Sequence, residues 1–182
     1  MSRVPDLDPQ AMTAEQQRIY AEIKGPRGGV GGPFALWIRL PQIADAANRF
    51  GNALRLDGKL DRRLFELMVL VIARHWNAQY EWFVHEPAAL KAGLDQRIVA
   101  AIRDGKEPPF EHNDERIVVV LTTELLETRT VSQETYGLVL SAFGLERFIE
   151  MITVAGFYTT AAMMINAFDA AVPGDARPLP DL

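Results

Sequence analysis

Cysteine is absent from the 182 residues of this chain. Its absence excludes disulfides, thiol redox chemistry, cysteine nucleophiles and thiolate metal ligands together. The 19 lysines and arginines form no cluster, and the formal net charge is −5 with a pI near 5.2. We therefore expect neither a nucleic acid nor an anionic membrane surface as a partner.

Long apolar runs are also lacking, since none reaches the ~20 residues that a membrane span requires. The first residues, MSRVPDLDPQAM, contain acids and prolines where a signal peptide has a basic start and an apolar stretch. These features predict a soluble, cytoplasmic protein. With 48% hydrophobic and 24% charged residues, the composition is that of a single globular domain spanning residues 1–182.

Strand patterns, in which apolar and polar residues alternate between turns, are missing as well. Helical patterns recur instead, so the fold class is predicted to be all-α. A helix is predicted over 13–24, where Gly25 and Pro26 would end it. Later helices are predicted to begin near Pro41, Asp61, Ala78, Asp95, Asn113 or Asp114, Ser132 and Leu145. The tail VPGDARPLPDL is predicted to be extended.

The most informative residue is Glu66, which lies in the run LFELMVLVI. This run is apolar on all sides, as in a buried helix. A buried carboxylate needs a partner. Arg62, Arg63 and Arg74 would make a purely structural pair, whereas His85 would make a functional one.

Contact between Glu66 and His85 requires a bend in the chain. On one unbroken helix, 19 residues at about 1.5 Å each would hold them roughly 28 Å apart. Asn77 offers a break, because its side chain can cap a new helix that begins at Ala78. If the two helices fold back on each other, Glu66 and His85 lie at comparable distances from the corner. Ala78, Glu81 and His85 then share one helix face.

Two other interpretations of these residues stay open. A Glu and a His four residues apart are often a solvated pair, worth a few tenths of a kcal/mol. A divalent cation at His85, Glu81 and Glu66, with or without His75, is the second. The helix carries no H-E-x-x-H pattern, so neither a metal nor another cofactor is predicted.

A family resemblance adds to this interpretation. The spacing of Glu66, Ala78, Glu81 and His85, the segment AQYEWFVHEPAAL and the later helix FIEMITVAGFY resemble the carboxymuconolactone decarboxylase-like family. That family includes the AhpD-type alkylhydroperoxidases. The resemblance covers about residues 30–170, the expected core. It implies an AhpD-like helical bundle with an active site between helices, assembled as trimers, hexamers or related homo-oligomers.

The two branches of this family imply different chemistry. The peroxidase branch carries a Cys-x-x-Cys pair where this chain has Ala78 and Glu81, so a thiol-dependent mechanism cannot operate. The decarboxylase branch is similar in having Tyr-Glu-Trp followed by His. It implies a cofactor-independent decarboxylase or isomerase of a small carboxylated lactone or related ring compound. The alternative is a non-catalytic ligand-binding or assembly member of the family, in which Glu66 and His85 form a structural pair.

In the catalytic interpretation, negative charge develops on the substrate and is delocalised into a carbonyl, so the site needs a proton donor. His85 is the predicted donor, Glu66 would orient it and favour its charged form, and Glu81 would shuttle or share the proton. Arg74 would pair with a substrate carboxylate. The glycine-rich loop 25–32 would serve as a lid. The predicted apolar lining is Phe34, Trp37, Tyr80, Trp82, Phe157 and Tyr158.

Overall fold

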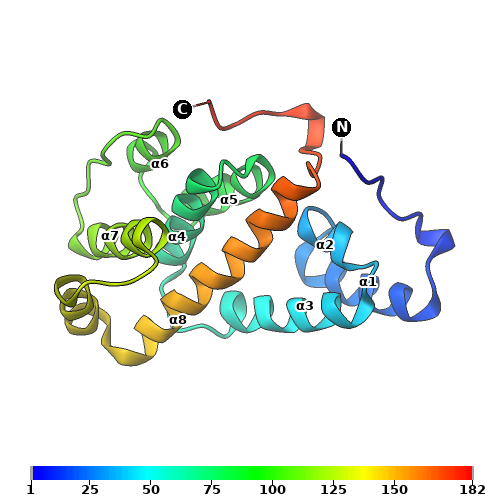
Figure 1. The fold of residues 1–182 in the computed structure, drawn as a ribbon, viewed down its shortest axis with the longest axis horizontal. Coiled ribbons are helices and arrows are strands. Elements are labelled where there is room, and N and C mark those ends of the chain that lie inside the picture. Colours follow the sequence, from blue (N-terminus) through cyan, green and yellow to red (C-terminus); the bar gives the residue numbers. More distant parts are fainter. Residues whose placement is uncertain (1, 182) are drawn as a thin grey trace.

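The computed structural model describes residues 2–181, and within this range the chain forms helices and no strand (Figure 1). The predicted all-α fold class is therefore confirmed. The α-helices are α1 (Ala14–Arg27), α2 (Pro33–Trp37), α3 (Pro41–Leu56), α4 (Arg62–His75), α5 (Gln79–Lys91), α6 (Gln96–Arg103), α7 (Asn113–Thr128) and α8 (Gln133–Ala167). Two 3₁₀ turns, η1 (Pro9–Ala11) and η2 (Pro173–Asp175), lie in the terminal segments.

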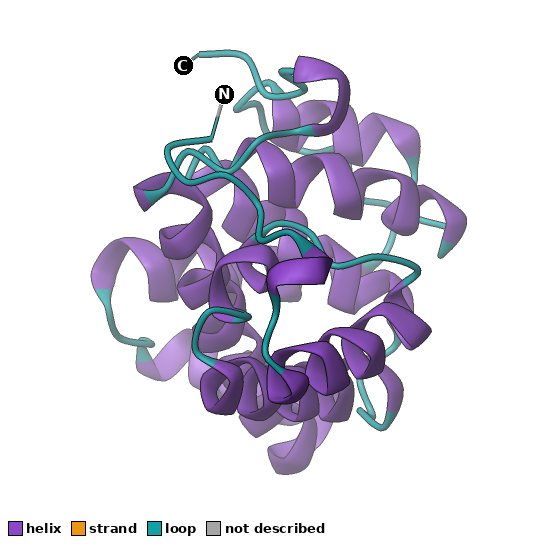
Figure 2. Cartoon of the chain, turned by 90° about the vertical axis from the view of Figure 1, so that its right-hand side faces the viewer, coloured by secondary structure: helices purple, strands orange, loops and turns teal. Residues whose placement is uncertain are grey.

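Helix α4 forms the centre of the molecule. It packs against α5, α6, α7 and α8 and lies among them in Figure 1. The view turned by 90° in Figure 2 shows helices joined by loops. Every residue from Leu64 to Ala73 is buried. Each large apolar side chain in this run contributes about 1.5–3 kcal/mol by leaving water. The run that is apolar on all sides is thus a core helix, as its sequence predicts.

Helix α8 runs diagonally across the molecule and joins two clusters of buried side chains (Figure 1). Met151 and Tyr158 belong to the large cluster around α4, whereas Ala161 belongs to a smaller one with residues of α1, α2 and α3. Gly144 interrupts the helix with a φ of 75°. The break that the sequence predicts at Gly144 is therefore present.

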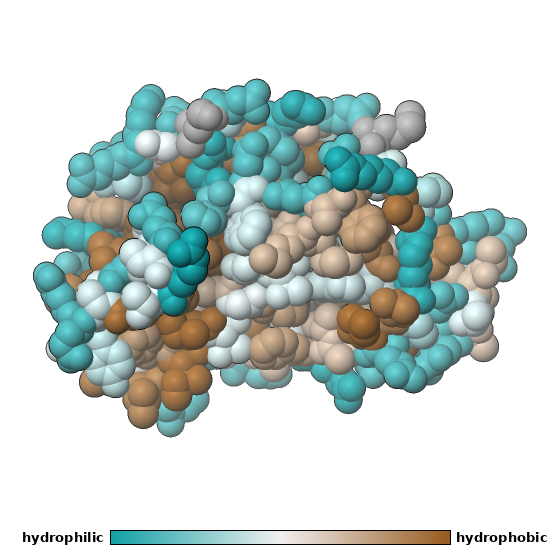
Figure 3. Space-filling model, in the orientation of Figure 1, coloured by the Kyte–Doolittle hydropathy of each residue, from teal (hydrophilic) through white to brown (hydrophobic). Residues whose placement is uncertain are grey.

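One face of α8 remains exposed and apolar, with Leu145, Ile149 and Met163 among its members. Figure 3 shows this side of the molecule, where apolar and weakly polar residues form a band across the middle. By length and mean hydropathy α8 is long and apolar enough to cross a membrane, but half of the relevant window is buried in the protein. One such helix is weak evidence, because the core helix of a soluble protein passes the same test. The homo-oligomer stays a prediction.

The first helix ends later than its sequence predicts. Thr13 caps α1 in a reciprocal capping box with Gln16. The helix then continues through Gly25 and Pro26 as far as Arg27, instead of ending at residue 24. A proline in the last turn removes a single helical hydrogen bond, which one turn tolerates. The left-handed Gly28, with a φ of 72°, ends the helix instead.

The corner between α4 and α5 exists, but it is built differently from the prediction. Asn77 adopts a left-handed φ of 49°, a conformation that asparagine tolerates better than most residues. The backbone N–H of Ala78 donates to the carbonyl of Ala73 at 2.8 Å. The Asn77 side chain does not cap α5, and its Oδ1 accepts from Arg74 Nη1 at 3.4 Å. The backbone of Asn77, rather than its side chain, therefore makes the turn.

Candidate active site

The corner brings Glu66 against His85. Glu66 Oε2 lies 2.6 Å from His85 Nδ1, and the Glu66 side chain is completely buried. Its other oxygen, Oε1, pairs with Arg62 one turn earlier on α4. His85 and Arg62, which the sequence offered as alternative partners, therefore both bind the Glu66 carboxylate. This double pairing compensates for the burial of its charge.

Glu81 approaches the opposite edge of the imidazole. His85 Nε2 lies 3.9 Å from Glu81 Oε1, one turn away on α5, and both side chains are buried. The Tyr158 ring of α8 meets the imidazole edge to face, with 5.1 Å between the ring centroids. His85 is thus held between two carboxylates and an aromatic ring, so the solvated Glu81–His85 pair is excluded.

The protonation states follow from this environment. Burial raises the pKa of Glu66, but the hydrogen bond and charge of His85 and the charge of Arg62 outweigh burial and lower this pKa overall. Burial lowers the pKa of His85, with Arg55 and Arg62 acting in the same direction, and the opposing effect of Glu66 does not overcome it. Glu66 therefore favours the charged imidazole, as predicted, but burial outweighs this effect and lowers the pKa of His85 overall.

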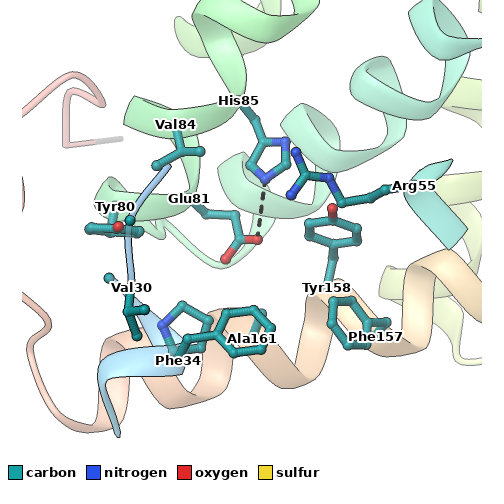
Figure 4. A pocket seen from close by; sticks show the side chains of 13 residues that line it. Val30, Phe34, Arg55, Tyr80, Glu81, Val84, His85, Phe157, Tyr158 and Ala161 are labelled. Carbon is teal, nitrogen blue, oxygen red and sulfur yellow. Dashed lines mark ion pairs between the residues drawn. The ribbon is translucent and has the colours of Figure 1, made fainter. Parts of the chain in front are cut away.

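A neutral imidazole beside a carboxylate has a defined tautomer. A carboxylate accepts hydrogen bonds only, so Nδ1 of His85 must carry the hydrogen and donate it to Glu66. Nε2 is then left with a lone pair on the side of Glu81 (Figure 4). This arrangement makes His85 a proton acceptor in the resting site. The roles of His85 as proton donor or as general base both stay predictions.

The same pKa directions predict that acid destabilises the fold. The pKa values of Glu66 and His85 lie below their ordinary values of 4.5 and 6.5. At a pH between the folded and the ordinary pKa of each group, the unfolded chain binds more protons than the folded chain. The contribution of Glu66 and His85 to the free energy of unfolding is therefore complete above pH 6.5 and is lost as the pH falls. Urea unfolding at neutral pH and at several pH values below 6.5 measures this loss. A midpoint that rises in acid would contradict it.

A cavity of about 340 Å³ opens in front of the imidazole (Figure 4). Its lining is mostly aromatic and aliphatic, with a few polar groups at one end, the common form of small-molecule sites. The lining side chains and backbone come from Gly29, Val30, Gly31, Pro33, Phe34, Arg55, Tyr80, Glu81, Val84, His85, Phe157, Tyr158 and Ala161.

Several predicted lining residues are in this cavity, and others lie behind it. Phe34 and Tyr80 line it, as predicted. Trp37 lies outside the lining and packs edge to face on Phe34, with 5.1 Å between the ring centroids. Trp82 is fully buried in the main core, where its indole N–H donates to Glu86 Oε2 at 3.0 Å. Trp37 and Trp82 therefore support the site without reaching its ligand space.

Arg74 does not reach the cavity. Its Nη1 donates to the carbonyl of Pro180 at 2.9 Å, which holds the C-terminal tail. The cation that does line the cavity is Arg55, from the last turn of α3. Sequence analysis missed Arg55, because a basic residue in the last turn of a helix is ordinarily explained by the helix dipole.

The glycine-rich loop forms one wall of the cavity through Gly29, Val30 and Gly31. It lies directly against the Tyr80 ring. A Cβ on Gly31 would lie 2.2 Å from Tyr80 Oη, and one on Gly32 would lie 2.3 Å from Tyr80 Cε1. Gly32 also has a φ of 55°, which favours glycine. The glycines therefore permit a close contact that side chains would block, and the lid role stays a prediction.

The alternative of a metal centre does not match the arrangement of the ligand atoms. Among residues 2–181, no group of three or more His, Asp or Glu side chains is placed to hold a metal ion. His75 is exposed at the end of α4, away from the cavity lining.

These features define the class of the protein as an all-helical, AhpD-like bundle with a buried Glu–His pair beside a small cavity. The family comparison agrees, because residues 41–111 match the model of the carboxymuconolactone decarboxylase family. The matched segment contains Arg55, Glu66, Glu81 and His85. The resemblance predicted from the sequence is thereby confirmed. No curated protein matches the chain significantly.

Solved structures show the same fold over nearly the whole chain. A peroxidase-related protein of unknown function from Ralstonia eutropha JMP134, described as an alkylhydroperoxidase AhpD core, has a TM-score of 0.80 at 15% identity and covers 98% of this chain and 95% of its own. A peroxidase-related protein from Silicibacter sp. TM1040 has a TM-score of 0.77 at 14% identity, and the match covers 96% of this chain and 92% of that protein. The debrominase Bmp8 has a TM-score of 0.75 at 11% identity, and the match covers 93% of this chain and 91% of that protein.

At these identities the structural likeness establishes the fold alone. The family model matches residues 41–111, and the solved structures share the helical fold of nearly the whole chain. The chemistry has to be argued from its own site.

Proposed function

We propose that this chain is a cofactor-independent enzyme that acts on a small carboxylated lactone or related ring compound by acid–base chemistry, as an isomerase or decarboxylase. The observation that carries the proposal is the geometry of His85, whose Nδ1 lies 2.6 Å from Glu66 Oε2 and which lines the cavity on the side of Nε2. Isomerisation fits the lowered pKa of His85 better, because a neutral imidazole takes a proton before it gives one.

The proposed reaction begins with abstraction of a proton from the carbon next to the ring carbonyl by His85 Nε2. The electron pair of the C–H bond forms a carbon–carbon double bond, and the carbonyl oxygen becomes an enolate oxygen. The new imidazolium is stabilised by the Glu66 carboxylate on Nδ1. In a substrate with a double bond between the β and γ carbons, the imidazolium then returns the proton to the γ carbon. The electron pair of that double bond takes the proton, the double bond forms anew between the α and β carbons, and the enolate oxygen re-forms the carbonyl, so atoms and electrons balance.

The rest of the cavity supports this chemistry. Phe34, Val84 and Phe157 line it with apolar groups that exclude water, which strengthens the electrostatic interactions of the few polar groups. A volume of about 340 Å³ suits a single substituted ring. Glu81, at 3.9 Å from Nε2, is placed to relay the proton between carbons.

Proton exchange tests the proposal without knowledge of the final product. A panel of unsaturated lactone carboxylic acids and muconate-type acids is incubated with the protein in D₂O and followed by proton NMR. We expect deuterium to enter the carbon next to the carbonyl of at least one compound at a rate far above the protein-free rate. Migration of the double bond in the same spectra identifies an isomerase.

The other outcomes of that experiment are equally informative. Loss of a carboxylate with release of CO₂ identifies the decarboxylase. Binding of a compound without exchange, bond migration or CO₂ release contradicts the proposal and favours the non-catalytic ligand-binding alternative. A reaction that proceeds unchanged without His85 contradicts the assigned base.

A further inference from the structure

Arg55 is the charged group that the proposed reaction has not yet used. It lies in the last turn of α3, and its guanidinium points toward His85 at the polar end of the cavity (Figure 4). Its backbone carbonyl accepts from Arg62 Nη1 at 3.3 Å. This bond ties the end of α3 to the start of α4, the helix that carries Glu66. Arg55 is therefore held next to α4, the helix whose Glu66 holds His85.

The Arg55 side chain has unused hydrogen-bonding capacity. Its Nε is buried and has no hydrogen-bond partner among the residues that the structure describes. A buried donor that lacks an acceptor is costly, so such a group commonly marks a place where a ligand supplies the acceptor. The hydroxyl of Tyr158 points to the same end of the cavity as the guanidinium (Figure 4). A ligand oxygen at this end of the cavity would supply the acceptor that Arg55 Nε lacks.

We propose that Arg55 binds the enolate oxygen that forms when His85 removes the substrate proton. The inference rests on the proposed function and identifies where its negative charge is stabilised. The proton that is removed and the carbonyl oxygen belong to adjacent carbons, so base and oxyanion donor must be neighbours in space. Arg55 and His85 meet this requirement. An arginine that only anchored a remote carboxylate would have no need to lie beside the base.

A donor aimed at developing charge also acts in the required direction. A cation beside an enolate stabilises the transition state more than the neutral carbonyl, which accelerates the reaction. Arginine remains charged at all relevant pH values and presents a planar set of donors to oxygen. A cation held on a departing carboxylate would instead stabilise the starting material. The position of Arg55 therefore favours enolate formation at this site.

Titration of bound 4-nitrophenol tests this inference without turnover. The phenol changes from a neutral hydroxyl to an oxyanion, and its visible absorbance reports which form is bound. An oxyanion site lowers the pKa of the bound phenol, by about one unit or more for a close cation. We expect this lowering in the wild-type protein and its loss in Arg55→Gln. Arg55→Lys, which keeps the charge without the planar donors, should retain part of it.

Arg49→Gln is the matched control, because Arg49 lies on the same helix and its side chain is 74% exposed. The pKa of 4-nitrophenol bound to Arg49→Gln should equal the pKa of 4-nitrophenol bound to the wild type. A wild-type protein that fails to bind the probe or to lower its pKa overturns the inference whether or not the variants fold. Equal lowering in Arg55→Gln, with its helicity verified by circular dichroism, also overturns it.

The proton-exchange experiment separates this inference from the proposed function. Exchange in the wild type that is equally fast in Arg55→Gln contradicts the inference alone. A lowered phenol pKa without any exchange supports the oxyanion site and contradicts the proposed reaction.

Discussion

Replacement of His85 by glutamine or alanine is expected to reduce turnover by about 10²–10⁴-fold, the usual contribution of a general base. Neither side chain can take a proton at Nε2, and neither can hold the charge that Glu66 stabilises. Steady-state rates on the compound identified by proton exchange measure the loss. The fall should be in kcat as well as in kcat/KM, because proton transfer occurs in the transition state.

The exposed His75 provides the matched control. His75→Gln removes an imidazole from the end of α4 and should leave turnover unchanged. Circular dichroism should show that His85→Gln keeps its helices, since glutamine can still donate to the Glu66 carboxylate. Unchanged turnover in a folded His85→Gln protein would remove the proposed mechanism.

Replacement of Glu66 by alanine is expected to lower the free energy of unfolding by about 1–3 kcal/mol, the usual cost of leaving a buried hydrogen-bond donor without its acceptor. Arg62, whose side chain is 39% exposed, could turn to solvent, but the buried N–H of His85 would lose its acceptor. Urea unfolding at neutral pH measures the change. Turnover should fall as well, because the tautomer of His85 is no longer fixed.

Glu66→Gln separates the two roles of this carboxylate. The amide oxygen can still accept from His85 Nδ1, so the stability loss should be smaller than in Glu66→Ala. Removal of the negative charge should lower the pKa of His85 further, since Glu66 raises it. The acid limb of the activity profile should move to lower pH.

The control for stability is Glu146→Gln, because Glu146 pairs with Lys59 at the surface, where ion pairs contribute about 0–1 kcal/mol. It should unfold close to the wild type. If Glu66→Ala unfolded at the same urea concentration as Glu146→Gln, the buried pair would not stabilise the fold.

The contact between Glu66 and His85 could be predicted because it depends on local chain geometry. Glu66 stands in a run without a polar face, so it must be buried and paired. A break near residue 77 then places residues at similar distances from the corner beside each other, which brings His85 to Glu66. The means of turning was predicted wrongly, since Asn77 acts through its left-handed backbone rather than as a cap.

The cation could not be predicted in the same way. Arg74 precedes the corner in sequence, and spacing alone suggested that it would face the site. It lies at the corner end of α4, where it binds the carbonyl of Pro180. Arg55 reaches the cavity because the segment 57–61 returns the end of α3 to the start of α4. The position of Arg55 depends on how helices pack in three dimensions, which the helical periodicity of the sequence does not predict.

The sequence by itself determined an all-helical chain without thiol chemistry and with a buried carboxylate, Glu66, that needs a partner, because composition and helical period act locally. Only the tertiary structure decided that His85 and Arg62 both bind Glu66, that burial lowers the pKa of His85, that Arg55 rather than Arg74 lines the cavity, and that Trp37 and Trp82 lie outside its lining. Burial and long-range packing set these properties, and both depend on which helices meet.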